Sequence, residues 1–175
     1  IDLDLEMNKL QKEGIEVLTI KDKDYPKMLR EIYNPPFFFF LRGRLKLEDD
    51  YAVAIVGARK CSDYGRQATR DISFSLAQNS ITVVSGLASG IDGIAHSAAL
   101  SIENGRTIAV LGSGIDDASI YPAENKKLAQ QIINGRGALI SEYPIGTPPL
   151  KQNFPARNRI ISGLSLGTVV IEATV

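Results

Sequence analysis

The sequence predicts an α/β domain built on a doubly wound, mostly parallel sheet. Residues 52–56 form an apolar run rich in β-branched residues, which is typical of a strand buried on both faces, and Gly57 ends the run. Ser62 and Asp63 are candidate N-caps for a helix over about 64–78. Strand and helix signals alternate from this unit onward. Such alternation favours parallel strands joined by crossover helices, and we expect the first strand near the centre of the sheet.

Composition limits the classes of protein to which the chain can belong. Its 175 residues suffice for one domain with an appendage, and an apolar content of 44% can form a good core. With 20 basic and 20 acidic residues the net charge is zero, so nucleic-acid binding would have to depend on a local patch. The single cysteine, Cys61, excludes a disulfide framework and indicates a reducing cytoplasm. No apolar run reaches membrane-spanning length.

Residues 1–50 differ from the rest and predict a small, partial α+β extension. Strand signals lie at 15–20 and 37–41, with a helix signal at 24–32 between them. The second strand begins with four consecutive phenylalanines, for which a strand buried on both faces is a better explanation than base stacking. Residues 51–175 then form the main domain, which we expect to be incomplete at its C-terminal end.

The turn after the first main strand carries cations where a dinucleotide-binding protein carries glycine. Backbone N–H groups and the helix dipole at such a corner favour an anion. A dinucleotide site would read G-x-G-x-x-G, but here Gly57 is followed by Ala58, Arg59 and Lys60. A guanidinium can bind a phosphate bidentately, which suits a phosphodiester. We therefore expect a nucleic-acid phosphate rather than NAD, and no cofactor. The alternative for Arg59 is a solvated loop cation.

The next turn is made of small residues and leads into a helix with the only histidine of the chain. A strand over 81–85 is followed by the turn 86–90 and a helix over 91–100. Small residues at such a turn let a ligand or another backbone approach. Asp92 and His96 lie four positions apart on one helical face, which favours a structural Asp–His pair over a role in a site. A single histidine makes no metal site and the spacing places no Ser or Cys nucleophile, so we predict neither a metal nor catalysis.

Two further strands, at 106–111 and 138–141, continue the predicted sheet, with a helix over 121–133 between them. Glu142 directly follows the second of these strands. It stands at the carboxyl end, where open α/β sheets bind their ligands. A last strand signal lies at 168–171.

A proline-rich, cationic segment over 143–162 is predicted to be an irregular loop. It carries Lys151, Arg157 and Arg159, and no Asp or Glu lies between Lys151 and the end of the segment. Phe154 lies among these cations, and a positive loop with an aromatic ring suits a nucleic-acid backbone with a base to stack. Loops after the first and fourth main strands emerge at the same sheet edge, so we expect the three cations to converge with the arginine of the first turn. The alternative is a salt-bridged loop that merely covers the edge.

Five motifs resemble those of the DprA/Smf DNA-processing family, in the same order, over about residues 24–173. They are Gly57-x-Arg59-x-x-Ser62-x-Tyr64-Gly65, Ser85-Gly86-x-Ala88-x-Gly90-Ile91-Asp92 with His96, Tyr121-Pro122-x-x-Asn125, Ser141-Glu142-x-Pro144-x-Gly146, and Phe154-Pro155-x-Arg157-Asn158-Arg159-Ile160-Ile161-Ser162. Each motif alone is weak, but together they are specific. The resemblance implies a bacterial, cytoplasmic protein with an extended Rossmann-like fold.

The resemblance also implies a function and a set of site residues. Members of the family bind single-stranded DNA during natural transformation, protect it and help to load the RecA recombinase; they are not enzymes, and full-length members are dimers. For this chain the implied DNA contacts are Arg59, Arg157 and Arg159, to which the charge pattern adds Lys151. The other expected DNA contacts are Gly57, Ser62, Phe154 and Asn158, and the expected pocket or structural positions are Ser85, Gly86, Gly90, Asp92, His96 and Glu142.

Two alternative functions come from other classes. A nucleotide-cleaving phosphoribohydrolase would share this kind of fold and carry a P-G-G-x-G-T-x-x-E turn, but residues 164–172 read LSLGTVVIE, without the glycine cradle. The other alternative is a scaffold that contacts the recombinase without DNA. Family members often carry an N-terminal helical module, of which at most a remnant is expected here, and a C-terminal winged-helix-like module, which we expect to be absent. We also expect the sheet to be cut short after Ile171, and the elements that would follow can form the dimer interface.

Overall fold

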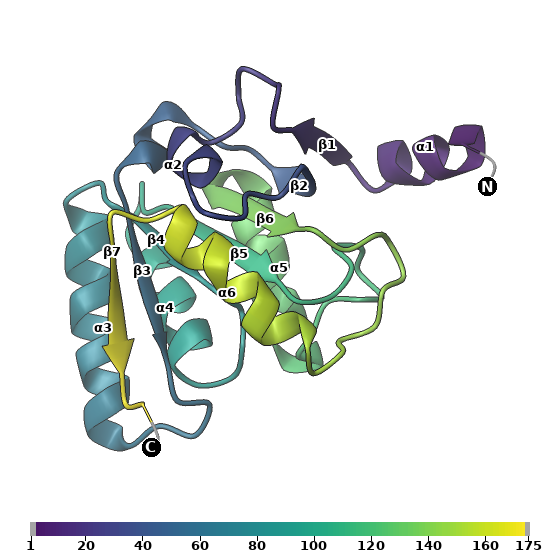
Figure 1. Ribbon diagram of the computed structural model, residues 1–175. Helices are drawn as coiled ribbons and strands as arrows, with labels where there is room; N and C mark the ends of the chain where they lie inside the picture. The colour runs from purple at the N-terminus through teal and green to yellow at the C-terminus, as the bar shows by residue number, and fades with distance from the viewer. Residues whose placement is uncertain (1–2, 174–175) are drawn as a thin grey trace.

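The computed structural model describes residues 3–173 and shows one mixed, seven-stranded sheet with helices on both faces (Figure 1). The strand order is β1-β2-β6-β5-β4-β3-β7. The strands are β1 (Ile15–Thr19), β2 (Phe38–Gly43), β3 (Ala52–Gly57), β4 (Thr82–Ser85), β5 (Thr107–Leu111), β6 (Gly137–Ser141) and β7 (Gly167–Ile171). The helices are α1 (Leu3–Lys12), α2 (Lys27–Arg30), α3 (Asp63–Gln78), α4 (Ile91–Leu100), α5 (Lys126–Gln131) and α6 (Asn153–Gly163), with short 3-10 turns at Leu47–Asp50 and Ala123–Asn125 and a π-type turn at Ile132–Arg136.

The pairing confirms the predicted α/β class with a mostly parallel sheet. β3 pairs in parallel with β4 and with β7, and β5 pairs in parallel with β4 and β6. β3 is nevertheless next to the edge strand β7, not near the centre, which β5 occupies. Local sequence patterns indicate which segments form strands, but they do not indicate which strands pair with each other.

The predicted N-terminal extension contributes two strands to the common sheet. β1 pairs antiparallel with β2, and β2 pairs antiparallel with β6. In the phenylalanine run, Phe39 and Phe40 are buried, whereas Phe37 is 72% and Phe38 is 43% exposed. Burial on both faces is therefore confirmed only for the second half of the run.

Two apolar layers enclose the sheet, as a doubly wound fold requires. On one face, Ala54 and Val110 pack with Leu29 of α2 and Ile160 of α6. On the other face, neighbouring sheet residues such as Ile55 pack against α3 and α4, and the β5–β6 part packs against α5. Successive strand residues thus bury their side chains on opposite faces.

The segment predicted as an irregular loop over 143–162 contains a helix, α6. Pro155 lies within its first turn, where the missing N–H group breaks no intrahelical bond. The prolines and charged residues of the segment favour a loop in a sequence-based prediction. They outweigh the helix signal of the apolar pair Ile160–Ile161, which packs on the sheet. This correction changes the site, because a helix holds its side chains in fixed directions.

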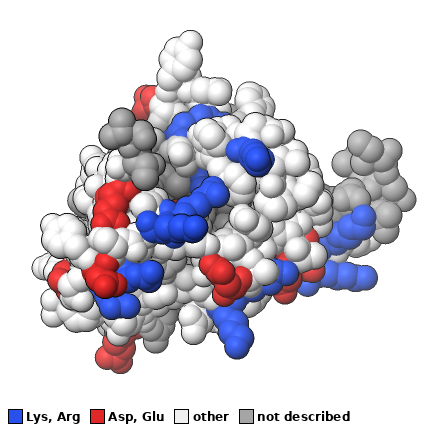
Figure 2. Space-filling model, turned by 90° about the horizontal axis from the view of Figure 1, so that it is seen from below, with Lys and Arg blue, Asp and Glu red and all other residues white. Residues whose placement is uncertain are grey.

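The carboxyl ends of the parallel strands meet at one edge of the molecule. Figure 2 looks onto this edge, and Lys and Arg side chains gather near the middle of the view. Gly90, with φ +76, brings the turn after β4 against the turn after β3. A Cβ atom there would lie 2.4 Å from the carbonyl oxygen of Arg59, so only glycine permits this approach.

Candidate nucleic-acid interface

A cavity of about 580 Å³ opens at the carboxyl edge between the turn after β3 and helix α6. We refer to it as the DNA cavity, after the DNA contacts that the sequence predicts there. Six of the eight predicted DNA contacts line it. Its lining residues include Gly57, Arg59, Ala88, Asp92, Tyr121, Pro149, Lys151, Phe154, Arg157 and Asn158. The six that lie together, as the sequence predicts for a shared site, are Gly57, Arg59, Lys151, Phe154, Arg157 and Asn158.

Arg59 and Lys151 supply exposed positive charge to the cavity from two different segments of the chain. Arg59 follows β3, and Lys151 precedes α6. The Arg59 guanidinium carbon lies 5.3 Å from the centre of the Phe154 ring, a cation–π arrangement that holds the side chain over the cavity. Neither side chain makes an ion pair within residues 3–173, so both cations can contact a phosphate directly.

Two aromatic rings form the apolar wall of the cavity. Phe154 projects from the first turn of α6, and Gly112 leaves room for it, since a Cβ atom at Gly112 would lie 2.9 Å from the ring. The Tyr121 ring is 46% exposed and its centre is 6.0 Å from that of Phe154. Tyr121 stands in one of the five motifs but is not among the predicted site residues, because a tyrosine before a proline at a helix start does not indicate the cavity that it lines.

Arg157 lines the cavity wall but is almost entirely buried, with 4% exposure. Its Nη1 donates to the carbonyl oxygens of Gly86, at 2.9 Å, and Val110. Burial lowers the pKa of Arg157, and the nearby Asp92 carboxylate opposes that shift. Nη1 of Arg157 is thus already hydrogen-bonded within the protein. Phosphate binding by Arg157 stays a prediction.

Asp92 is the buried anion beside that guanidinium. Its Oδ2 accepts from the N–H of Gly86 at 3.1 Å. Burial raises the pKa of Asp92, and the Arg157 charge opposes this. Gly86 fits between the two groups, because a Cβ atom there would lie 2.6 Å from Arg157 Nη1 and from Asp92 Oδ2.

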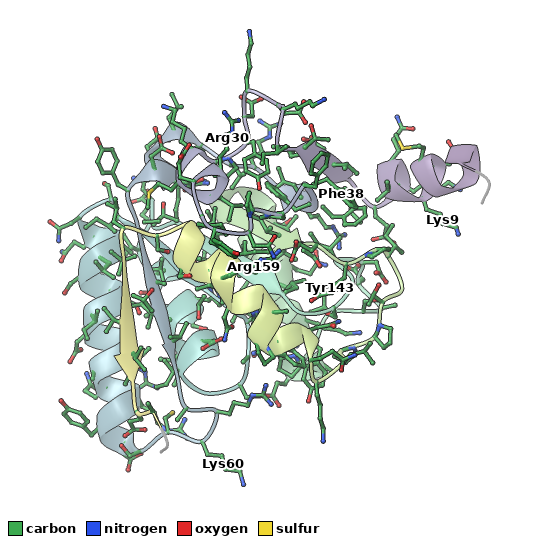
Figure 3. The ribbon with its side chains drawn as sticks, in the orientation of Figure 1. Lys9, Arg30, Phe38, Lys60, Tyr143 and Arg159 are labelled. Carbon is green, nitrogen blue, oxygen red and sulfur yellow. The ribbon has the colours of Figure 1, made fainter. Side chains whose placement is uncertain are left out.

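Arg159 does not line the DNA cavity, contrary to the expected convergence of four cations. Its Nη1 and Nη2 donate to the two carboxylate oxygens of Glu142 at 2.6 and 2.5 Å, and its Nε donates to the carbonyl oxygen of Asn34. These hydrogen bonds raise the pKa of Arg159. Figure 3 shows it beside α6, well above Lys60 at the lower edge. Arg159 and Glu142 therefore join α6, β6 and the N-terminal segment.

Ser62 also lies outside the cavity lining. Its Oγ accepts from the N–H of Gly65 at 3.1 Å and so caps α3, as predicted. Its N–H donates to Glu172 Oε2 at 2.8 Å, and its hydroxyl donates to Oε1 of the same carboxylate. These bonds lower the pKa of Glu172. The anion that sequence analysis expects at this helix start is thus a carboxylate of the chain itself.

Asp92 and His96 do not form the predicted pair. His96 Nδ1 faces Thr107 Oγ1 at 2.6 Å, and that hydroxyl donates to the carbonyl oxygen of Val83. The hydroxyl must therefore accept from Nδ1–H, which leaves Nε2 unprotonated. Nε2 is buried without a hydrogen-bond partner. Ser85 is likewise structural, because its Oγ donates to the Ile55 carbonyl at 2.6 Å.

Over residues 3–173 there is no group of three or more His, Cys, Asp or Glu side chains that could hold a metal ion. Within the same part of the chain, no helix is long and apolar enough to cross a membrane. The fold and the cavity define a Rossmann-like α/β protein with a cationic, aromatic-walled cavity at the carboxyl edge of its parallel strands.

Comparison with known proteins gives the particular family. The sequence matches the family described as DNA recombination-mediator protein A over residues 16–175. It is 48% identical to protein Smf of Synechocystis, covering 93% of this chain and 41% of that protein. It is 46% identical to the DNA processing protein DprA of Streptococcus pneumoniae, covering 89% and 53%. The chain belongs to the DprA/Smf family, and it spans about half the length of the curated relatives that it matches.

Two solved structures share the fold. The X-ray structure of DprA from Streptococcus pneumoniae superposes with a TM-score of 0.85 at 43% identity, covering 98% of this chain and 59% of that one. The DNA processing protein A of Helicobacter pylori superposes with a TM-score of 0.76 at 32% identity, covering 89% and 68%. The structure of the Helicobacter protein was described for its single-stranded DNA binding mode.

Proposed function

We propose that this chain binds single-stranded DNA in the DNA cavity and acts in DNA recombination as a mediator. The observation that carries the proposal is the convergence of exposed Arg59 and Lys151 on a wall formed by Phe154 and Tyr121. The cations neutralise phosphates and the rings stack bases, which is the general chemistry of sequence-tolerant single-strand sites. Duplex DNA binds worse, because its paired bases cannot reach the rings.

The wider role of the protein forms part of the same proposal. The single-strand binding described for the Helicobacter pylori relative supports it. We propose that the full-length protein is a cytoplasmic homodimer that protects DNA taken up in natural transformation and helps to load the RecA recombinase. We also propose that the protein is not an enzyme, and an assay for the release of free bases from nucleotides tests that part.

Arg59→Ala is expected to weaken single-strand binding roughly tenfold, about equally for all sequences. Because one phosphate contact on a single strand contributes about 0.7 to the log–log salt slope, the slope should become flatter by about that amount. Fluorescence anisotropy with labelled oligo-dT over a range of salt concentrations measures both quantities, with duplex DNA for comparison. Arg59→Lys should recover most of the slope because it keeps the charge.

The matched control is Arg44→Ala. Arg44 is an exposed arginine that follows β2 at the opposite edge of the sheet, where Gly43 pairs with Ala138 at the start of β6. Removing it should leave binding unchanged. Equal affinity and equal slope for wild type and Arg59→Ala would show that Arg59 is a solvated loop cation and that the DNA cavity is misassigned.

A further inference from the structure

A second groove, of about 630 Å³, lies between helices α3 and α4 next to the DNA cavity. We refer to it as the α3–α4 groove. α3 contributes Arg66, Arg70 and Phe74 to one wall. The facing part of α4 has small residues, including Gly93 and Ser97, and their size leaves the groove open.

The DNA cavity and the α3–α4 groove adjoin along two stretches of chain. In the turn after β4, Ala88 lines the cavity, whereas the next residue, Ser89, lines the groove. Before α5, Tyr121 lines the cavity and Glu124 lines the groove. Ser89 Oγ donates to Glu124 Oε1 at 2.6 Å and joins the two stretches at the boundary. A strand that leaves the cavity across this boundary therefore enters the groove.

Three side chains of α3 give this groove the chemistry of a single-strand site. Arg66, Arg70 and Phe74 are spaced four residues apart and form one row, about 12 Å long, along the helix. Arg66 has only an exposed contact to Asp63, at 3.9 Å. Arg70 is exposed, and its side chain makes no hydrogen bond or ion pair within residues 3–173. The two guanidinium groups can bind phosphates, and the Phe74 ring, 41% exposed, can stack a base.

We propose that the α3–α4 groove binds the continuation of the single strand that enters the DNA cavity. This inference rests on the proposed function, because the cavity supplies the strand. Asp71 of α3 also lines the groove, where its Oδ1 accepts from Gln67 Nε2 at 2.8 Å, and its charge partly offsets that of the arginines. The carboxylate of Glu124 stands at the boundary and repels phosphates. It limits affinity there, while its hydrogen bond with Ser89 holds the two stretches together.

The test uses two lengths of labelled oligo-dT, about 4 nucleotides to occupy the DNA cavity and about 16 to reach the groove. For the double variant Arg66→Ala/Arg70→Ala, affinity for the longer strand should fall about tenfold. Its log–log salt slope should flatten by about 1.4, for two lost phosphate contacts. Affinity for the shorter strand should not change. Arg44→Ala, at the opposite sheet edge, is the control for lost surface charge.

Two single variants separate stacking from charge. Phe74→Ala should weaken binding of the longer strand without changing the salt slope, because it removes a ring and no charge. Glu124→Gln should tighten binding of the longer strand only, because it removes the negative charge and keeps an oxygen that can accept from Ser89. Circular dichroism verifies that each variant keeps its fold.

The two proposals fail in different ways. In one outcome, the double variant binds the longer strand as tightly as the wild type does, and the shorter strand is also bound. The α3–α4 groove then does not bind the strand, and the proposed function stands. If the double variant loses affinity equally for both lengths, the arginines act on the DNA cavity and the extension is overturned. If the wild type binds neither length, the proposed function is overturned together with the extension.

Discussion

Replacing Arg157 with alanine is expected to lower the free energy of unfolding by about 3–5 kcal/mol. Arg157 is 4% exposed, and loss of its guanidinium leaves the Asp92 carboxylate buried without its cationic neighbour. The carbonyl oxygens of Gly86 and Val110 lose their side-chain donor as well. Unfolding in urea at neutral pH, followed by circular dichroism, measures the difference.

Arg159→Ala is the matched control, since it makes the same chemical change two positions along the same helix. The Arg159–Glu142 pair is partly exposed, with side-chain exposures of 28% and 22%. Its loss should therefore cost only about 1 kcal/mol. If both variants lose the same stability, burial of the Arg157 charge is not what makes this position sensitive.

Acid should destabilise the protein through His96. Burial and the neighbouring Arg157 charge lower the pKa of His96 from 6.5 to about 3. The unfolded chain therefore binds a proton that the folded chain excludes, and stability is lost as pH falls below 6.5 towards 3. Between about pH 7.5 and about pH 5, the loss from this one group is about 2 kcal/mol. Urea unfolding at both pH values measures it.

His96→Asn isolates this contribution, because an amide nitrogen can still donate to Thr107 Oγ1 but does not titrate. The loss of stability between the two pH values should be smaller in the variant by about 2 kcal/mol. The raised pKa of Asp92 acts in the opposite direction, since the folded chain then binds a proton more readily than the unfolded chain. An identical pH dependence in wild type and variant would contradict a neutral, buried His96.

Strand and helix positions follow closely from local patterns. The run predicted at 52–56 is β3, and the helix predicted over about 64–78 is α3, whose cap is Ser62. Each element is continuous in sequence, and β3 is largely buried while α3 is clearly capped, so composition and periodicity suffice to predict them. Strand order was not accessible in this way, because pairing between β2 and β6 depends on contacts almost a hundred residues apart.

The candidate site shows the same difference between what local sequence predicts and what depends on distant contacts. Arg59 and Lys151 reach the cavity as expected, because each directly adjoins a recognisable turn or strand end. Arg159 has the same charge and motif context but is bound by Glu142, 17 residues earlier in the chain. The sequence shows where a cationic side chain is, but it does not show which carboxylate forms an ion pair with it. Ser62 illustrates the same limit, since its partner Glu172 lies 110 positions away.

The β3–β7 pairing has a consequence for how the chain folds during synthesis. Val53 of β3 pairs with Gly167 of β7, so 114 positions separate the two partners. Ribosomes add about 5–20 residues per second. The edge of β3 that pairs with β7 therefore stays unpaired for roughly 6–23 s, until β7 has been synthesised. An unpaired strand edge is a template for association with other chains. The nascent protein is thus prone to aggregate in this interval, and the long-range, parallel pairing of β3 with β7 is slow to form.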